Sequence, residues 1–138
     1  VQQLPVKQHR TKTTNRYFNY IYVRMGAHTL INKRTEDDIW KNLFELPLIE
    51  TEKDLSEEEF LSCPQFHALF AEGEVRIVRT LLRGVKHVLS HRVIYTNFYE
   101  VTLPDDSDSF SGYQLVAVED LDRYAVPRLI HAFLEKYV

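Results

Sequence analysis

The chain has 138 residues, of which 44% are apolar and 12% aromatic, and its formal net charge is −3. This length and composition are typical of one globular domain with one sizeable core, and they exclude a disordered protein. No apolar run is long enough to span a membrane, and the single cysteine excludes an internal disulfide and an all-thiolate metal site, which favours a reducing compartment.

The first segment, residues 1–15, is polar and basic and has no hydrophobic period, so it indicates a linker that arrives from something upstream. The chain also begins without Met, which favours a fragment of a longer protein. Residues 16–24 are aromatic and β-branched and predict a strand. A turn at Met25 and Gly26 would then bring residues 27–33 back as a second strand paired with the first.

Residues 35–46 predict a loop with large apolar anchors, and Trp40 in this loop is more often a core anchor than a base-stacking group. Pro47 then begins a short extended piece. Ser56 and Glu59 have the spacing of an N-cap and its capping box, so a helix should begin here.

The apolar positions that follow Ser56 are interrupted at Pro64, so one broken helix or two short helices would fit. Cys63 lies at this interruption, and we expect it to be an ordinary, partly buried side chain. Residues 75–103 predict strands with a bend at Gly84 and a loop at 87–91.

The last third predicts a turn-forming loop over 105–112, a strand over 113–118 and a terminal helix over 127–137. Pro127 would lie in the first turn of this helix. The whole order, β-β-loop-α-β-β-β-α, indicates an α+β fold.

Charge is segregated along the chain. Residues 1–34 contain seven Lys or Arg and residues 75–99 contain five, and neither stretch has an Asp or Glu. If the two stretches fold side by side, they form a positive face on an acidic protein, which suits a polyanion. An ordinary solvated surface is an equally good interpretation of the charge alone.

An acidic cluster follows the extended piece: Glu50, Glu52, Asp54, Glu57, Glu58 and Glu59. Such a cluster could hold Mg²⁺ for pyrophosphate chemistry, because Mg²⁺ prefers hard oxygen ligands. Three consecutive glutamates on a helix point in different directions, however, and no Arg-Glu pair precedes them. A solvated face is the better interpretation, and we predict no metal site.

His87, Ser90 and His91 lie within five residues. A hydrolase would need an orienting carboxylate and an oxyanion hole, and a zinc site would need further ligands, and neither pattern is evident. The hydroxyl of Ser90 and the ring of His91 could instead contact a base edge from a tight loop. An ordinary surface loop is the alternative.

Three segments in chain order resemble one family. Residues 30–47 contain Lys-Arg, then Trp40, then Leu-Phe-Glu-Leu-Pro; residues 86–91 read Lys-His-Val-Leu-Ser-His; residues 122–127 read Asp-Arg-Tyr-Ala-Val-Pro. Together with Leu-Pro-Val-Lys at 4–7, they resemble the C-terminal domain of the MutY family of adenine DNA glycosylases, and the likeness covers about residues 4–138.

The resemblance implies a Nudix-like α/β/α sandwich with a mixed β-sheet over residues 16–138, in which the hydrolase signature is lost. The family uses this domain to recognise 8-oxoguanine opposite adenine in double-stranded DNA. Excision belongs to an N-terminal catalytic domain with a 4Fe-4S cluster, which this chain lacks. The resemblance therefore implies no cofactor and no catalytic residue here, no membrane partner, and a cytoplasmic, nucleoid-associated protein of a bacterium.

The resemblance also assigns site residues. Ser90 and His91 would read the lesion, with Leu89 at the position of a family Phe. The nearest cations, Arg92, Lys86 and Arg83, would contact the DNA backbone, which positions the protein without specifying sequence. The alternatives are a free-standing Nudix hydrolase of nucleoside diphosphate-linked compounds and a Nudix-fold protein-interaction module.

Overall fold

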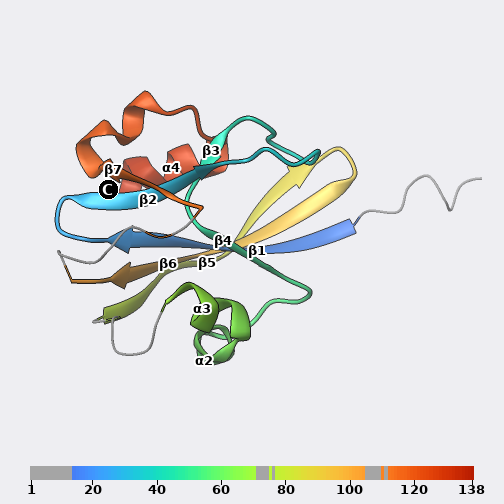
Figure 1. The fold of residues 1–138 in the computed structure, drawn as a ribbon. Helices are drawn as coiled ribbons and strands as arrows, with labels where there is room; N and C mark the ends of the chain where they lie inside the picture. The colour runs from blue at the N-terminus through green and yellow to red at the C-terminus, as the bar shows by residue number, and fades with distance from the viewer. Residues whose placement is uncertain (1–13, 71–74, 76, 105–109, 111) are drawn as a thin grey trace, which may run out of the picture.

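The computed structural model describes residues 14–70, 75, 77–104, 110 and 112–138 (Figure 1). The strands are β1 (Thr14–Arg24), β2 (His28–Lys33), β3 (Phe44–Glu45), β4 (Leu48–Thr51), β5 (Ile77–Leu89), β6 (Arg92–Thr102) and β7 (Gln114–Ala117). The helices are α2 (Glu57–Ser62), α3 (Pro64–Leu69), the 3₁₀ helix η1 (Val118–Arg123) and α4 (Arg128–Tyr137).

The strands form two sheets. The larger sheet has the order β4-β1-β6-β5, with β1 parallel to β6 and antiparallel pairs on either side, and the smaller sheet has the order β3-β2-β7. Helices α2 and α3 lie on one side of the larger sheet, and α4 with the smaller sheet lies on the other (Figure 1). This arrangement confirms the predicted α/β/α sandwich with a mixed β-sheet.

The predicted pairing of β2 with β1 is wrong. β1 has β4 on one edge and β6 on the other, so no edge is free for β2. Among the described residues, a bridge from Met25 to His28 closes the turn at Gly26, and β2 then pairs with β7 and β3 in the other sheet. The turn was predicted correctly, but the competing partners of β1 lie far away in the sequence.

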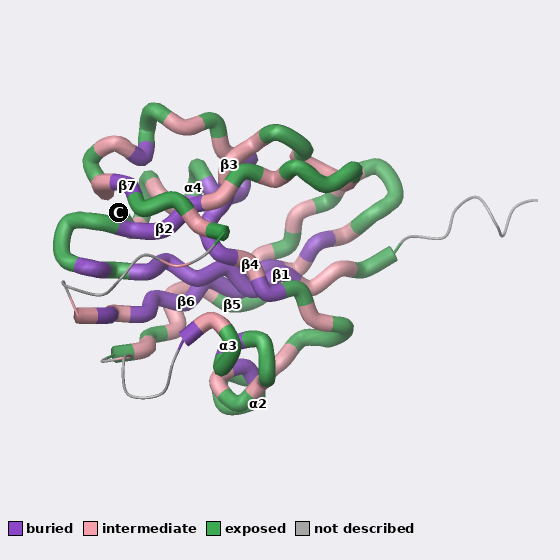
Figure 2. The backbone as a smooth tube through the Cα atoms, in the orientation of Figure 1, coloured by how far each residue is buried: buried purple, intermediate pink, exposed green. Residues whose placement is uncertain are grey.

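β1 is buried on both faces over residues 18–23, which explains why most of these residues are aromatic or β-branched. Phe18 and Tyr20 belong to the core beneath α4, where Phe98 and Phe133 stack at 4.2 Å. Ile21 belongs to the second core, beneath α2 and α3. The middle of the sheet is therefore buried, whereas its ends and the surrounding loops are exposed (Figure 2).

The helix starts follow the sequence closely. Ser56 caps α2: its hydroxyl accepts from the Glu59 amide at 3.1 Å, and the Glu59 carboxylate accepts from the Ser56 amide at 2.9 Å. Pro64 separates α2 from α3, so two short helices form, and Cys63 between them is half-buried as predicted. Pro127 precedes α4 as its N-cap.

Two further expectations have different outcomes. The loop predicted over 105–112 lies largely outside the described residues. The 3₁₀ helix η1 was not predicted; it follows β7 directly and buries Leu121 against the core. The strand predicted over 113–118 is confirmed as β7.

β5 and β6 form a long hairpin whose regularity is broken where the bend was expected. The register shifts twice between Thr80 and Val85, and Gly84 there has a φ of 67°, which favours glycine. The Gly84 amide donates to the Asn97 side chain at 2.8 Å. β5 continues to Leu89, so the loop expected over 87–91 narrows to a turn of Ser90 and His91.

Candidate nucleic-acid interface

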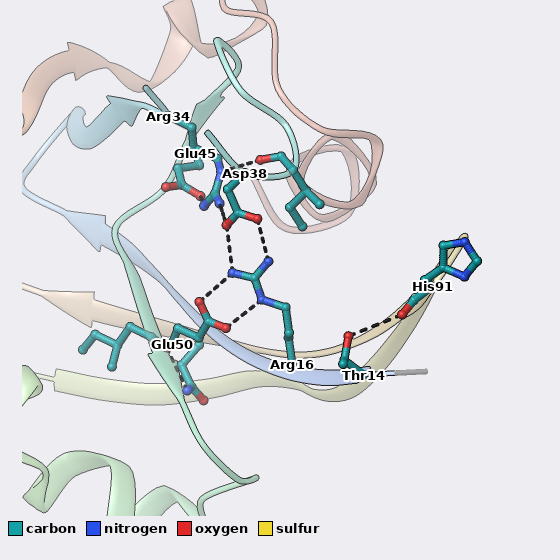
Figure 3. A network of polar contacts seen from close by, with 10 residues as sticks. Thr14, Arg16, Arg34, Asp38, Glu45, Glu50 and His91 are labelled. Carbon is teal, nitrogen blue, oxygen red and sulfur yellow. Dashed lines mark hydrogen bonds and ion pairs between the residues drawn. The ribbon is translucent and has the colours of Figure 1, made fainter. Parts of the chain in front are cut away.

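The tip of the β5–β6 hairpin carries Ser90 and His91, and both side chains are exposed. The start of β1 holds the backbone of this turn, because the Thr14 amide donates to the His91 carbonyl at 3.1 Å and the Thr14 hydroxyl donates to the same oxygen at 3.3 Å. Figure 3 shows the His91 ring pointing away from the neighbouring network. The turn thus combines a fixed backbone with side chains that are free to meet a partner.

The inner side of the hairpin rests on the core. Leu89 is half-buried and packs against the core beneath α4. The His87 ring lies 5.8 Å from the Trp40 ring, which in turn makes an edge contact with Phe18 at 6.1 Å. Trp40 is therefore a core anchor, as predicted, and the loop that carries it supports the hairpin from behind.

Three cations near the tip differ in their surroundings. Lys86 and Arg92 are exposed and make no ion pair within the described part of the chain. Arg83 donates to the Leu55 carbonyl at 2.8 Å and to the Tyr99 hydroxyl at 3.0 Å, and it pairs with Asp54 at 3.3 Å. Its guanidinium therefore connects the hairpin to the segment before α2.

A second group of charges lies where β1 meets β4 and the Trp40 loop (Figure 3). Arg16 donates twice to Asp38 and twice to Glu50, each bond 2.8 Å long. Arg34 pairs with Asp38 at 2.9 Å and with the buried Glu45 at 3.0 Å. We call these five residues the paired network.

The paired network explains two perturbed acids. The Arg16 guanidinium, which hydrogen-bonds Asp38, lowers the pKa of that carboxyl to about 2. Burial, together with the charge of Glu45, raises the pKa of Tyr20 well above its usual value, and the Tyr20 hydroxyl donates to Glu45 at 2.9 Å. These side chains are engaged with one another, which indicates a structural role.

The two cationic stretches do lie side by side, because β1 and β6 pair over their whole length. Most of their arginines, however, meet acids from elsewhere in the chain. Besides the paired network, Arg24 and Arg79 both pair with Glu100, at 3.4 and 2.6 Å. Within the described residues, the positive face expected from the sequence is therefore smaller than expected and lies mainly at the hairpin tip.

The acidic cluster does not converge. Glu50 faces Arg16, Asp54 faces Arg83, Glu57 contacts the Thr80 hydroxyl and Glu59 caps α2. No group of three or more His, Cys, Asp or Glu among the described residues could hold a metal ion. The carboxylates of the described residues therefore do not form the converging set that an Mg²⁺ site of a Nudix hydrolase needs.

None of the helices in the described part of the chain has both the length and the apolar character needed to cross a bilayer. The model of the NUDIX domain family matches residues 19–136. A comparison with curated proteins found no match.

Solved structures share the fold. The C-terminal domain of mouse MUTYH, in complex with human PCNA, has a TM-score of 0.65 and 15% identity over 88% of this chain and 86% of that one. The MutT protein of Methanosarcina mazei Go1 has a TM-score of 0.55 and 17% identity over 90% and 93%. The NUDIX domain of Shewanella oneidensis NrtR, complexed with ADP ribose, has a TM-score of 0.55 and 14% identity over 91% of this chain and 89% of that one.

Proposed function

Since the chain belongs to the NUDIX domain family, we propose that it is a DNA-reading module of that family, which recognises 8-oxoguanine opposite adenine for an adenine glycosylase. One observation carries the proposal: Ser90 and His91 project from a hairpin turn whose backbone is fixed by Thr14. A fixed turn with free polar side chains is suited to reading a base edge. The shared fold with the mouse MUTYH domain supports this function.

The chemistry of the lesion suits these two side chains. Guanine presents N7 as an acceptor in the major groove. Oxidation at C8 converts N7 into an N–H donor and adds a carbonyl oxygen. The Ser90 hydroxyl can accept from that N–H, and the His91 ring can donate to the new oxygen. Guanine has no oxygen at C8 for His91 and presents an acceptor at N7, to which the Ser90 hydroxyl could only donate, so the contact to the C8 oxygen is specific to the lesion.

The groups around the tip have supporting roles. Leu89 is half-buried, so we assign it to holding the turn on the core rather than to stacking on a base. Lys86 and Arg92 contact phosphates, which adds affinity without sequence preference. Excision of the adenine, with base flipping, belongs to a catalytic domain of the same longer protein.

Replacing both reading groups tests the proposal. Ser90→Ala with His91→Ala should reduce the preference of the chain for duplexes with 8-oxoguanine:adenine over guanine:adenine by about tenfold, since a net hydrogen bond contributes about 0.5–1.5 kcal/mol. Fluorescence anisotropy at low salt with the two duplexes measures this ratio. A double variant that melts like wild type and keeps the full preference would show that the tip does not read the lesion.

Arg92→Ala is the matched control, because it removes an exposed side chain next to the turn. It should weaken binding to both duplexes about equally if Arg92 contacts phosphate. A change confined to the lesion duplex would instead place Arg92 in base recognition.

The alternative function is hydrolysis of nucleoside diphosphate-linked compounds, which the fold shared with MutT proteins supports. The dispersed carboxylates argue against it, since Glu57 and Glu59 are engaged with Thr80 and Ser56. We expect no turnover of dGTP, 8-oxo-dGTP or ADP ribose with Mg²⁺ or Mn²⁺. Turnover by the wild-type chain that disappears in Glu58→Gln or Glu59→Gln would show that the chain is a hydrolase and would contradict its assignment as a DNA-reading module.

A further inference from the structure

A pair of stacked tyrosines lies on the α2 side of the larger sheet, near the hairpin. Tyr17 and Tyr95 are register partners on β1 and β6, and their rings stack at 5.6 Å with an interplanar angle of 17°. Their strand neighbours Phe18 and Ile94 enter the core beneath α4, so the tyrosines face the opposite side. Both are only half-buried.

The helices leave this end of the sheet uncovered. In Figure 1 the β5–β6 hairpin and the start of β1 extend past α2 and α3, and Figure 2 shows the same strand ends as exposed or half-buried. A cavity of about 260 Å³ opens here, lined by Asn15, Tyr17, Asp54, Gly84 and Tyr95. We call this cavity, with its two stacked rings, the tyrosine tray.

The tray has an acceptor on its wall. Asp54 receives hydrogen bonds from Asn97 at 3.0 Å and from Arg83 at 3.3 Å, which fix the carboxylate, and its side chain is still 54% exposed. A carboxylate has about four acceptor positions, so it can receive further N–H donors from a ligand. The wall of the cavity at Gly84 borders open space, because nothing lies within 4 Å of the place where a Cβ would be.

Lys86 and Val88 lie between the tray and the reading turn. Lys86 is the register partner of Tyr95, and Val88, 65% exposed, is the partner of Val93. Because side chains alternate along a strand, Lys86 and Val88 share the face of Tyr95 and lead towards Ser90. Lys86 makes no ion pair with any described residue, so it is available to a phosphate.

We propose that the tyrosine tray binds one unpaired guanine base of a DNA strand. The base stacks on the tyrosine pair, the N1–H and the exocyclic N–H of guanine donate to Asp54, and Lys86 contacts a flanking phosphate. Adenine presents a single donor group at that edge and matches the carboxylate less well. The tray extends the proposed function, because it would hold the same DNA that the turn at Ser90 reads.

Short single strands without any lesion test the tray. The probes are thymidine hexamers with one central dG or one central dA, and dGMP as a free nucleotide, each titrated into the chain and followed by ¹⁵N-¹H NMR. We expect the dG hexamer to bind more tightly than the dA hexamer and than dGMP. Equal binding of dGMP and the dG hexamer would show a free-nucleotide site and overturn the assignment to a DNA strand.

Variants separate the three contacts. Tyr95→Leu should weaken binding of the dG hexamer roughly 5- to 150-fold, the range that corresponds to about 1–3 kcal/mol for one stacked base. Asp54→Asn should abolish the preference for dG over dA. Lys86→Gln, an exposed change that spares the fold, should weaken both hexamers and lower the salt dependence.

Tyr124→Leu is the matched control, since Tyr124 is a half-buried tyrosine that packs on Phe44 beside the α4-side core, away from the tray. It should leave hexamer binding unchanged. If Tyr95→Leu melts well below wild type, Lys86→Gln and Asp54→Asn decide the question instead. If all three tray variants bind the dG hexamer like wild type, the tray is not a guanine-binding site. Because the hexamers contain no 8-oxoguanine, this result is independent of lesion reading at Ser90 and His91.

Discussion

The arginines of the paired network and the cations of the hairpin tip both come from stretches of sequence that contain no Asp or Glu, yet folding uses their charges in opposite ways. In the network, Arg16 and Arg34 keep 19% and 10% of their side chains exposed, and each binds two carboxylates. At the tip, Lys86 and Arg92 are exposed and have no such partner among the described residues. The cations that the fold leaves without an acid are the ones available to a polyanion.

The largest difference between the two regions should appear in stability. Arg34→Ala leaves Glu45, 5% exposed at its side chain, without a cation, and the free energy of unfolding should fall by about 3–5 kcal/mol. Lys86→Ala at the tip should change it by less than about 0.5 kcal/mol. Urea denaturation of both variants measures the contrast.

A double variant sharpens this test. Arg34→Met with Glu45→Gln removes both charges but keeps an acceptor for the Tyr20 hydroxyl, so it should recover much of the lost stability. A loss below about 1 kcal/mol in Arg34→Ala would contradict a structural role for the pair.

Much of the fold could be predicted from the sequence, because local signals dictate it. Residues close together in the sequence determine the Ser56 capping box, the break at Pro64 and the irregularity at Gly84. The pairing of β2 and the acids that bind Arg16 are not, because both depend on segments brought together by folding. Arginine and carboxylate patterns give no local sign of their eventual partners.

The candidate site divides in the same way. The resemblance located Ser90 and His91, and the hairpin places both in its turn. The tyrosine tray was not foreseen, since Tyr17 and Tyr95 become neighbours only through the parallel pairing of β1 and β6. The aromatic and β-branched residues of 16–24 predict a strand, but they do not show which ring remains accessible.

Salt dependence of DNA binding should separate the tip from the neighbouring structural cation. Lys86→Gln and Arg92→Gln should each lower the slope of log affinity against log salt by about 0.9. Arg83→Gln should leave the slope unchanged and lower the melting temperature, because Arg83 is bound by Asp54 and Leu55. If Arg83→Gln lowers the slope as much as Lys86→Gln does, then Arg83 contacts the DNA backbone, as the resemblance implies.

The smallest effect concerns acid stability of the network. Arg16 lowers the pKa of folded Asp38 to about 2, below an unfolded value of about 3.9, so this contribution is complete above pH 4 and is lost as the pH falls towards 2. Asp38→Asn should be less stable than wild type at pH 7, and the gap should narrow between pH 4 and 2. Thermal melts across this pH range measure the difference in stability between wild type and Asp38→Asn. A difference that does not depend on pH would show that the ion pair with Arg16 is not its cause.

The most direct test of lesion reading is a map of backbone amide shifts when the chain is titrated with a duplex that contains 8-oxoguanine opposite adenine, compared with the same duplex containing guanine. We predict that the amides whose shifts differ between the two duplexes are those of Ser90, His91 and Leu89, while Arg16, Arg34 and Asp38 respond alike to both. Differences confined to the paired network, with an unchanged hairpin tip, would contradict the assignment of lesion reading to this turn.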